Sequence, residues 1–127
     1  MQGKLPGTYD RKQLAKTAEP SSQFALRTLQ WWEETIGRHL PKLNPDSGVE
    51  NVLAVSHGSY ISTLCRALFN SGIIEVPPDM EYSRCYNTSI TIIDMRNDKR
   101  GFLLKYCDIS HLTEPVVETN ADEIPTN

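Results

Sequence analysis

Apolar residues between positions 22 and 40 recur every three or four residues, which is the spacing of one face of a helix. Either Ser21 or Ser22 is suited to the N-cap of this helix, and Pro41 ends it. The apolar stripe consists of Ala25, Leu29, Trp32, Ile36 and Leu40. The pattern therefore predicts an amphipathic helix over residues 22–40.

A second helical stripe follows Tyr60. Its members have the spacing i, i+3, i+4, i+7, i+8 and are Ile61, Leu64, Cys65, Leu68 and Phe69. Asn70 and Gly72 close the stripe, and Gly72 is suited to the left-handed position that follows a helix. We expect a helix that begins near Tyr60 and ends near Asn70.

An uninterrupted apolar run, Val52–Val55, lies directly ahead of the polar turn Ser56–Ser59. Such a run, bounded by a turn, is typical of a strand that is buried on both faces. A turn that leads from this kind of strand into a helix lies at the carboxyl edge of a sheet, where open α/β sheets bind ligands. We therefore predict a central strand over residues 51–55, with His57 at the ligand-binding edge.

Two further strands are predicted near the C-terminus. Residues 87–94 are rich in β-branched side chains, residues 97–101 form a turn, and residues 102–107 make the second strand of a hairpin. Residues 73–86 are predicted to be a long connecting loop. Its length indicates a role beyond joining two elements. The fold class is therefore α/β, with about three strands and helices on both faces of the sheet. A sheet of this size with a buried central strand is incomplete and requires something else to cover or extend it.

The length of 127 residues fits one domain, which we place at residues 1–113. A short helix is predicted at residues 9–17, and residues 114–127 are predicted to be a polar, disordered tail. The net charge of -3, without a basic block or a long apolar run, argues against nucleic-acid and membrane partners.

The cysteines are odd in number and widely spaced, at positions 65, 85 and 107. This spacing is neither a disulfide framework nor a zinc knuckle. We expect free thiols, an intracellular and cytoplasmic location, and no metal or cofactor.

The candidate chemistry centres on His57. The backbone amides of Gly58, Ser59 and Tyr60 would point from a helix N-terminus toward the same place, and with a cationic histidine they would bind a phosphate group. The alternative is a buried histidine that forms a hydrogen bond with the backbone of its own turn.

Other chemistries fit the sequence less well. A Ser-His-Asp hydrolase requires a nucleophile elbow, and neither Ser56 nor Ser59 has glycines at the right offsets. No spacing supports a zinc site built from His39, His57 and His111. Arg27, Arg66, Trp31 and Trp32 are interpreted as helix-surface and core residues rather than as ligand contacts.

Two segments resemble the histidine phosphatase superfamily, which has the phosphoglycerate mutase-like fold. Residues 52–59 resemble its second catalytic motif, and residues 86–94 are similar to the strand that follows its catalytic loop, with Asn87 and Thr88 near the site. Weaker likenesses are carried by Gly3–Gly7, by Glu19 with Ser21 and Arg27, and by His111–Leu112. The resemblance spans roughly residues 1–113. The subgroup that looks nearest is that of the fructose-2,6-bisphosphatase-like and cofactor-dependent mutase-like phosphatases.

The resemblance implies a phosphomonoester hydrolase or phosphoryl-transfer enzyme that acts through phosphohistidine on a phosphorylated small molecule. His57 would stabilise the transferring phosphoryl group, and Gly58, Ser59, Asn87 and Thr88 would contact phosphate. The family's nucleophile lies in an R-H-G motif, which this sequence lacks, because Arg38-His39 is followed by Leu40. The likeness is thus to the C-terminal half of such a domain, truncated and expected to be inactive alone.

An alternative function is a non-catalytic binding or assembly module. A half-domain with an exposed sheet edge would pair with another chain, either a complementing chain or a second copy in a homodimer.

Overall fold

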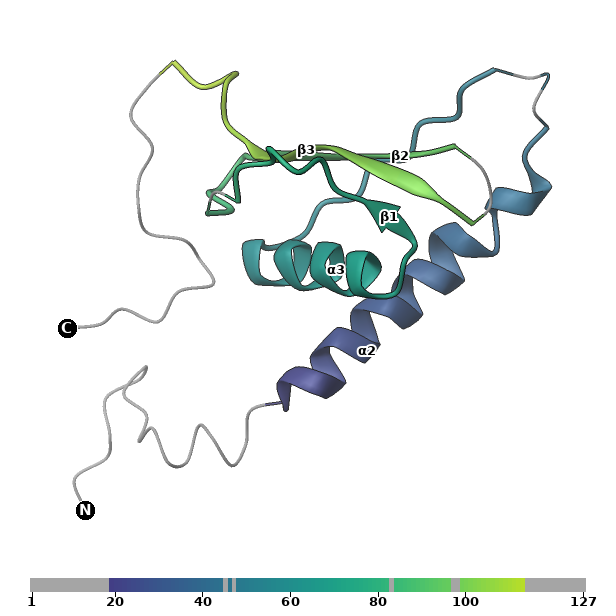
Figure 1. The fold of residues 1–127 in the computed structure, drawn as a ribbon, viewed down its shortest axis with the longest axis horizontal. Helices are drawn as coiled ribbons and strands as arrows, with labels where there is room; N and C mark the ends of the chain where they lie inside the picture. The colour runs from purple at the N-terminus through teal and green to yellow at the C-terminus, as the bar shows by residue number, and fades with distance from the viewer. Residues whose placement is uncertain (1–18, 45, 47, 83, 97–98, 114–127) are drawn as a thin grey trace.

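Two helices and a small mixed sheet form the part of the chain that the computed structural model describes, which is residues 19–113 without 45, 47, 83 and 97–98. The predicted helix at residues 9–17, the Gly3–Gly7 segment and the predicted tail at residues 114–127 lie outside the described residues. Figure 1 shows the sheet with both helices on the same side of it.

Helix α2 spans Ser21–Trp32 and confirms the first part of the helix predicted over residues 22–40, whose predicted end at Pro41 is wrong. The helical path continues as a π-helical turn, η1 (Glu33–Gly37), and then as a 3-10 turn, η2 (Leu40–Lys42). The N-cap is Pro20, whose carbonyl oxygen accepts a 3.0 Å hydrogen bond from the amide of Phe24. The predicted serine cap is therefore wrong, because the extended backbone of Pro20 places both serines inside the first turn.

Helix α3 spans Gly58–Asn70 and buries Leu64, Cys65 and Leu68, as the spacing predicted. Phe69 is half exposed and lies at the margin of the buried face. At the end of the helix, Gly72 has φ 73°, which confirms its predicted left-handed conformation. The amide of Ile73 then donates to the carbonyl of Leu68 at 2.9 Å, and that of Gly72 donates to Phe69 at 3.0 Å. These two bonds are those of a Schellman motif.

The sheet has the strand order β1-β3-β2, formed by β1 (Ile74–Glu75), β2 (Ile90–Met95) and β3 (Gly101–Asp108). Strands β2 and β3 are antiparallel, which confirms the predicted hairpin. Strand β1 pairs in parallel with β3, although its residues fall in the predicted loop over positions 73–86. A strand of two residues is too short to have a recognisable alternation, and its pairing depends on the Schellman turn that aims it at β3.

The predicted central strand over residues 51–55 is wrong. These residues have no regular secondary structure, and their side chains face solvent: Val52 is 58% exposed, Leu53 90% and Val55 90%. Their composition is that of a strand buried on both faces, yet the described part of the chain supplies neither a neighbouring strand nor a covering helix. Three strands are present as predicted, but β1 takes the place of this segment.

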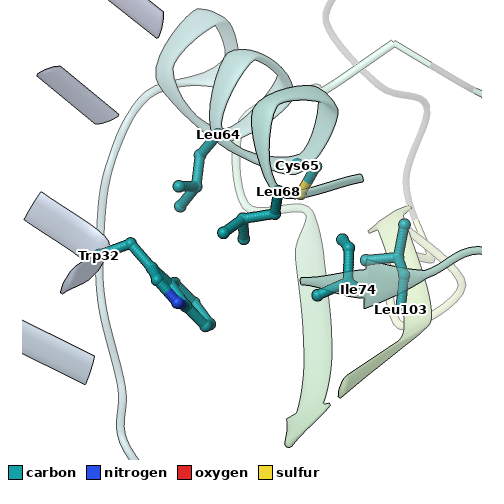
Figure 2. Packing of buried hydrophobic residues seen from close by; sticks show 6 residues of the cluster. All are labelled: Trp32, Leu64, Cys65, Leu68, Ile74 and Leu103. Carbon is teal, nitrogen blue, oxygen red and sulfur yellow. The ribbon is translucent and has the colours of Figure 1, made fainter. Parts of the chain in front are cut away.

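The core lies between the helices and one face of the sheet. Figure 2 shows that its side chains converge from α2, α3, β1 and β3, and they are Trp32, Leu64, Cys65, Leu68, Ile74 and Leu103. On β3, Leu103 is buried whereas its neighbours Phe102 and Leu104 are exposed. Ile90 and Ile92 of β2 are exposed as well, and these four apolar side chains of β2 and β3 are here called the open face. The α/β class is confirmed, but α2 and α3 share one side of the sheet instead of covering both.

No described helix combines the length and the apolar character that crossing a bilayer requires.

Candidate functional site

The N-terminus of α3 brings three of the predicted site residues together in consecutive positions. His57 is the N-cap residue, with φ -112° and ψ 157°, and its carbonyl oxygen accepts the first bond of the helix, from Ile61 at 2.9 Å. The amides of Gly58, Ser59 and Tyr60 precede that bond, so the helix itself gives them no acceptor. No acidic residue lies in this first turn. The arrangement favours an anion in front of the helix.

His57 is exposed, not buried. The alternative interpretation, a buried histidine that stabilises its own turn, is therefore wrong. The exposure follows directly from that of Val52–Val55, since nothing in the described chain packs over the segment that leads into the helix. An exposed imidazole at this position is accessible to a ligand, but it lacks the desolvated surroundings in which electrostatic catalysis is strongest.

Arg27 of α2 lies beside the first turn of α3, which the sequence did not indicate. Its guanidinium carbon is 5.7 Å from the ring centroid of Tyr60 and 5.0 Å from that of Phe24. Two hydrogen bonds to the Glu19 carboxylate, from Nε at 3.1 Å and from Nη2 at 3.0 Å, hold the guanidinium in place. These bonds raise the pKa of Arg27 further above its usual value. The cation is thus close to the anion-favouring helix terminus, but Glu19 offsets its charge.

Asn87 and Thr88, the other two predicted phosphate contacts, lie on a separate element. They are the exposed central residues of a turn that leads into β2 and is closed by a 3.1 Å hydrogen bond from the amide of Ser89 to the carbonyl of Tyr86. Thr88 has φ 66°, a conformation that is uncommon for a β-branched residue. Residues with strained backbone are common at functional sites, but this conformation by itself assigns no role to the turn.

The prediction of free thiols is wrong for two of the three cysteines. Cys85, in the connection before β2, and Cys107, on β3, are joined by a disulfide, and only Cys65 is free. The amide of Cys107 donates to Oγ1 of Thr91 at 3.0 Å, which aligns this part of β3 with β2. A sequence separation of 22 residues conceals the pair, because the hairpin brings Cys107 back toward the residues that precede β2.

Cys65 is buried in the core, and this burial raises the pKa of its thiol to about 11. Because the thiolate is the reactive form, two pKa units above the usual value of 9.0 leave roughly 100-fold less nucleophile at pH 8. Iodoacetamide should therefore alkylate Cys65 in the folded, oxidised protein at least roughly 100-fold more slowly than in urea-unfolded protein. The rate in the folded protein should continue to rise with pH until about 11.

Mass spectrometry of the alkylated chain measures these rates. The unfolded protein at the same pH is the matched control, because it carries the same thiol in solvent. A folded-state rate within a few-fold of the unfolded rate would contradict the burial of Cys65.

The remaining histidines are distant in the sequence and have other surroundings. His39 Nε2 lies 2.9 Å from a carboxylate oxygen of Glu50, and His111 is exposed in the turn that follows β3. Within the described ranges, no group of three or more His, Cys, Asp or Glu side chains has the geometry of a metal site.

Neither a protein-family model, nor a curated protein, nor a solved structure matches this chain.

Proposed function

We propose that residues 19–113 provide one side of a phosphate-binding pocket of the histidine phosphatase type, within a phosphoglycerate mutase-like sandwich. In this proposal a second polypeptide segment completes the pocket and supplies the nucleophile. The ligand is a phosphorylated small molecule or phosphate itself. The reaction class is phosphomonoester hydrolysis or phosphoryl transfer through phosphohistidine.

The observation that carries the proposal is the exposure of Val52–Val55 immediately ahead of His57. Four consecutive aliphatic residues fit a strand in the middle of a sheet, where both faces are covered. Here the same residues have no regular secondary structure and lead to a helix N-terminus with an exposed histidine. A strand that paired with Val52–Val55 would bury the run and place its own end residues beside His57.

The chemistry assigned to His57 is electrostatic. As an imidazolium it would offset the negative charge that accumulates on the phosphoryl oxygens, while the amides of Gly58 and Ser59 donate hydrogen bonds to them. Arg27 would add a second positive charge once an anion competes with Glu19 for the guanidinium. The sequence lacks the R-H-G motif that carries the nucleophile of that superfamily, so residues 19–113 alone should not turn over a phosphate ester.

Phosphate binding tests the ligand part of the proposal. In a titration with inorganic phosphate, against chloride at equal ionic strength, amide NMR signals of Gly58, Ser59 and Tyr60 should shift. His57→Ala should weaken this binding roughly tenfold, because it removes one charge-assisted hydrogen bond. The matched control is His111→Ala, another exposed histidine, which should bind as the parent does.

Two results would contradict the proposal. Equal shifts in the His57→Ala and His111→Ala variants would show that the helix N-terminus does not hold the anion through His57. Rapid hydrolysis of an aryl phosphate by this chain alone, lost in His57→Ala, would show that no second segment is required.

A second candidate function is a module that pairs with another chain through its sheet. The open face carries four exposed apolar side chains, those of Ile90, Ile92, Phe102 and Leu104, and β2 is an edge strand. Exposed apolar patches and unpaired strand edges are typical of interaction surfaces. Sedimentation equilibrium tests this function: a dimer that Ile92→Lys converts to monomer supports it, whereas a monomer at all concentrations counts against self-pairing.

A further inference from the structure

The Cys85–Cys107 bond connects two parts of the chain that are otherwise held in different ways. Cys107 belongs to β3 and lies at a shift in its register with β2, where a hydrogen bond from its amide to Oγ1 of Thr91 holds it against that strand. Cys85 belongs to the connection between β1 and β2, residues 76–89. The two Cα atoms are 4.9 Å apart, within the range that a disulfide spans without movement of the backbone.

The connection 76–89 is only lightly attached to the sheet. Its described backbone hydrogen bonds close local turns: Met80 to Pro77, Tyr86 to Arg84 and Ser89 to Tyr86. Its noncovalent contacts include those of Val76 and Met80 with the core, and an edge-to-face contact between Tyr82 and Tyr106 with centroids 5.7 Å apart. Most of its other described side chains are exposed. Cys85 is the covalent tie between this connection and the sheet.

The two sides of the bond therefore respond differently to its cleavage. Cys107 keeps its place in the hairpin whether or not the bond exists, because its backbone is held by β2. Cys85 loses a fixed point and moves with the connection. The turn that contains Asn87 and Thr88 begins directly after Cys85, so it is released with it.

The third thiol does not compete for exchange. Cys65 is buried in the core on α3, and that burial strongly disfavours its thiolate. Cys85 and Cys107 are also buried, but they face each other with their Cα atoms 4.9 Å apart, whereas Cys65 is bonded to neither. Cys85 is the more exposed of the bonded pair, at 8% against 1% for Cys107, so a small thiol or disulfide reaches it first.

We propose that Cys85 and Cys107 form a reversible disulfide switch, in exchange with low-molecular-weight disulfides of the glutathione class, that fastens and releases the connection 76–89. On oxidation, the Cys85 thiolate attacks glutathione disulfide to form a mixed disulfide and expels one glutathione thiolate. The Cys107 thiolate then attacks Sγ of Cys85 and expels the second. The protein thus loses two protons and two electrons, and one glutathione disulfide becomes two glutathione molecules. The switch does not depend on phosphate binding.

A redox titration of the full chain tests the exchange. The protein is equilibrated in glutathione buffers of graded reduced-to-oxidised ratio, quenched in acid, alkylated with N-ethylmaleimide and mapped by mass spectrometry. We expect one disulfide, Cys85–Cys107, whose fraction follows the ratio, and Cys65→Ser should give the same curve. A disulfide that involves Cys65, stable glutathione adducts in place of the pair, or no disulfide in the most oxidising buffer would each overturn the proposal.

Hydrogen exchange of the oxidised and the reduced wild-type protein tests the release. After reduction, amides in residues 80–89 should exchange close to the rate of an unfolded chain, whereas those of Leu64–Leu68 in α3 should stay protected and accelerate by no more than the loss of global stability requires. Unchanged rates in residues 80–89 would show that the bond fastens nothing. Loss of protection across α3 as well would show that the bond supports the whole domain instead of switching one connection.

Discussion

Leu68→Ala should lower the free energy of unfolding by about 3–5 kcal/mol. Leu68 is fully buried at the centre of the core, between α2 and the sheet, where Trp32 and Ile74 enclose it (Figure 2). The substitution removes buried aliphatic groups and leaves a cavity that the surrounding strands and helices only partly fill. Since a domain of this size is stabilised by roughly 5–15 kcal/mol, much of the folded population would be lost. Urea denaturation followed by circular dichroism measures the change.

Phe69→Ala is the matched control, because Phe69 is the next residue of the same helix and is 49% exposed. It has a similar effect on helix propensity but opens a smaller cavity, so we expect a loss well below that of Leu68→Ala. Equal losses in the two variants would contradict the orientation of α3 against the sheet.

Reduction of the Cys85–Cys107 disulfide should lower the free energy of unfolding by about 3 kcal/mol. The bond closes a loop with a sequence separation of 22 residues, which restricts the unfolded chain. The folded state changes less, because the hairpin and the core do not depend on the bond. Urea denaturation with and without dithiothreitol gives the difference.

The control for this reduction is the double variant Cys85→Ala/Cys107→Ala, whose stability should not respond to dithiothreitol. A response in the double variant would mean that the reductant acts elsewhere. A loss below about 1 kcal/mol in the parent chain would mean that the bond is not formed in the folded protein, or that strain cancels its contribution.

Elements with long, regular patterns were predictable from the sequence. The spacing of Leu64, Cys65 and Leu68 located α3 and its buried face, and Gly72 located its end. The β-branched residues before the polar turn at residues 97–101 located the hairpin. In each case neighbours along the chain create the structure, so local pattern and final contacts agree.

The misplaced strand has a different cause. The composition of Val52–Val55 predicts burial, but burial requires partners that residues 19–113 do not provide, and a pattern reports only what a segment is suited to. Strand β1 shows the converse, since Ile74–Glu75 has almost no pattern and becomes a strand because β3 is beside it.

The candidate site likewise contains some residues that the sequence predicts and some contacts that only the tertiary fold creates. His57, Gly58 and Ser59 are consecutive, so the strand-turn-helix pattern was enough to group them at one helix terminus. The position of Arg27 beside Tyr60 depends on how α2 crosses α3, and the Cys85–Cys107 pair depends on the hairpin. No local signal carries either contact. Asn87 and Thr88 entered through a family resemblance, and their role stays a prediction.

The segment Asn51–Ser56 also affects how the protein behaves when it is concentrated. It contains no charge, proline or glycine, its aliphatic residues favour extended backbone, and it is exposed in the folded state. Identical segments from many copies would stack in register and interlock their side chains, as in the spine of an amyloid fibril. Because the segment is already exposed in the folded state, fibril growth could begin from folded protein, and its lag time would not depend on global unfolding.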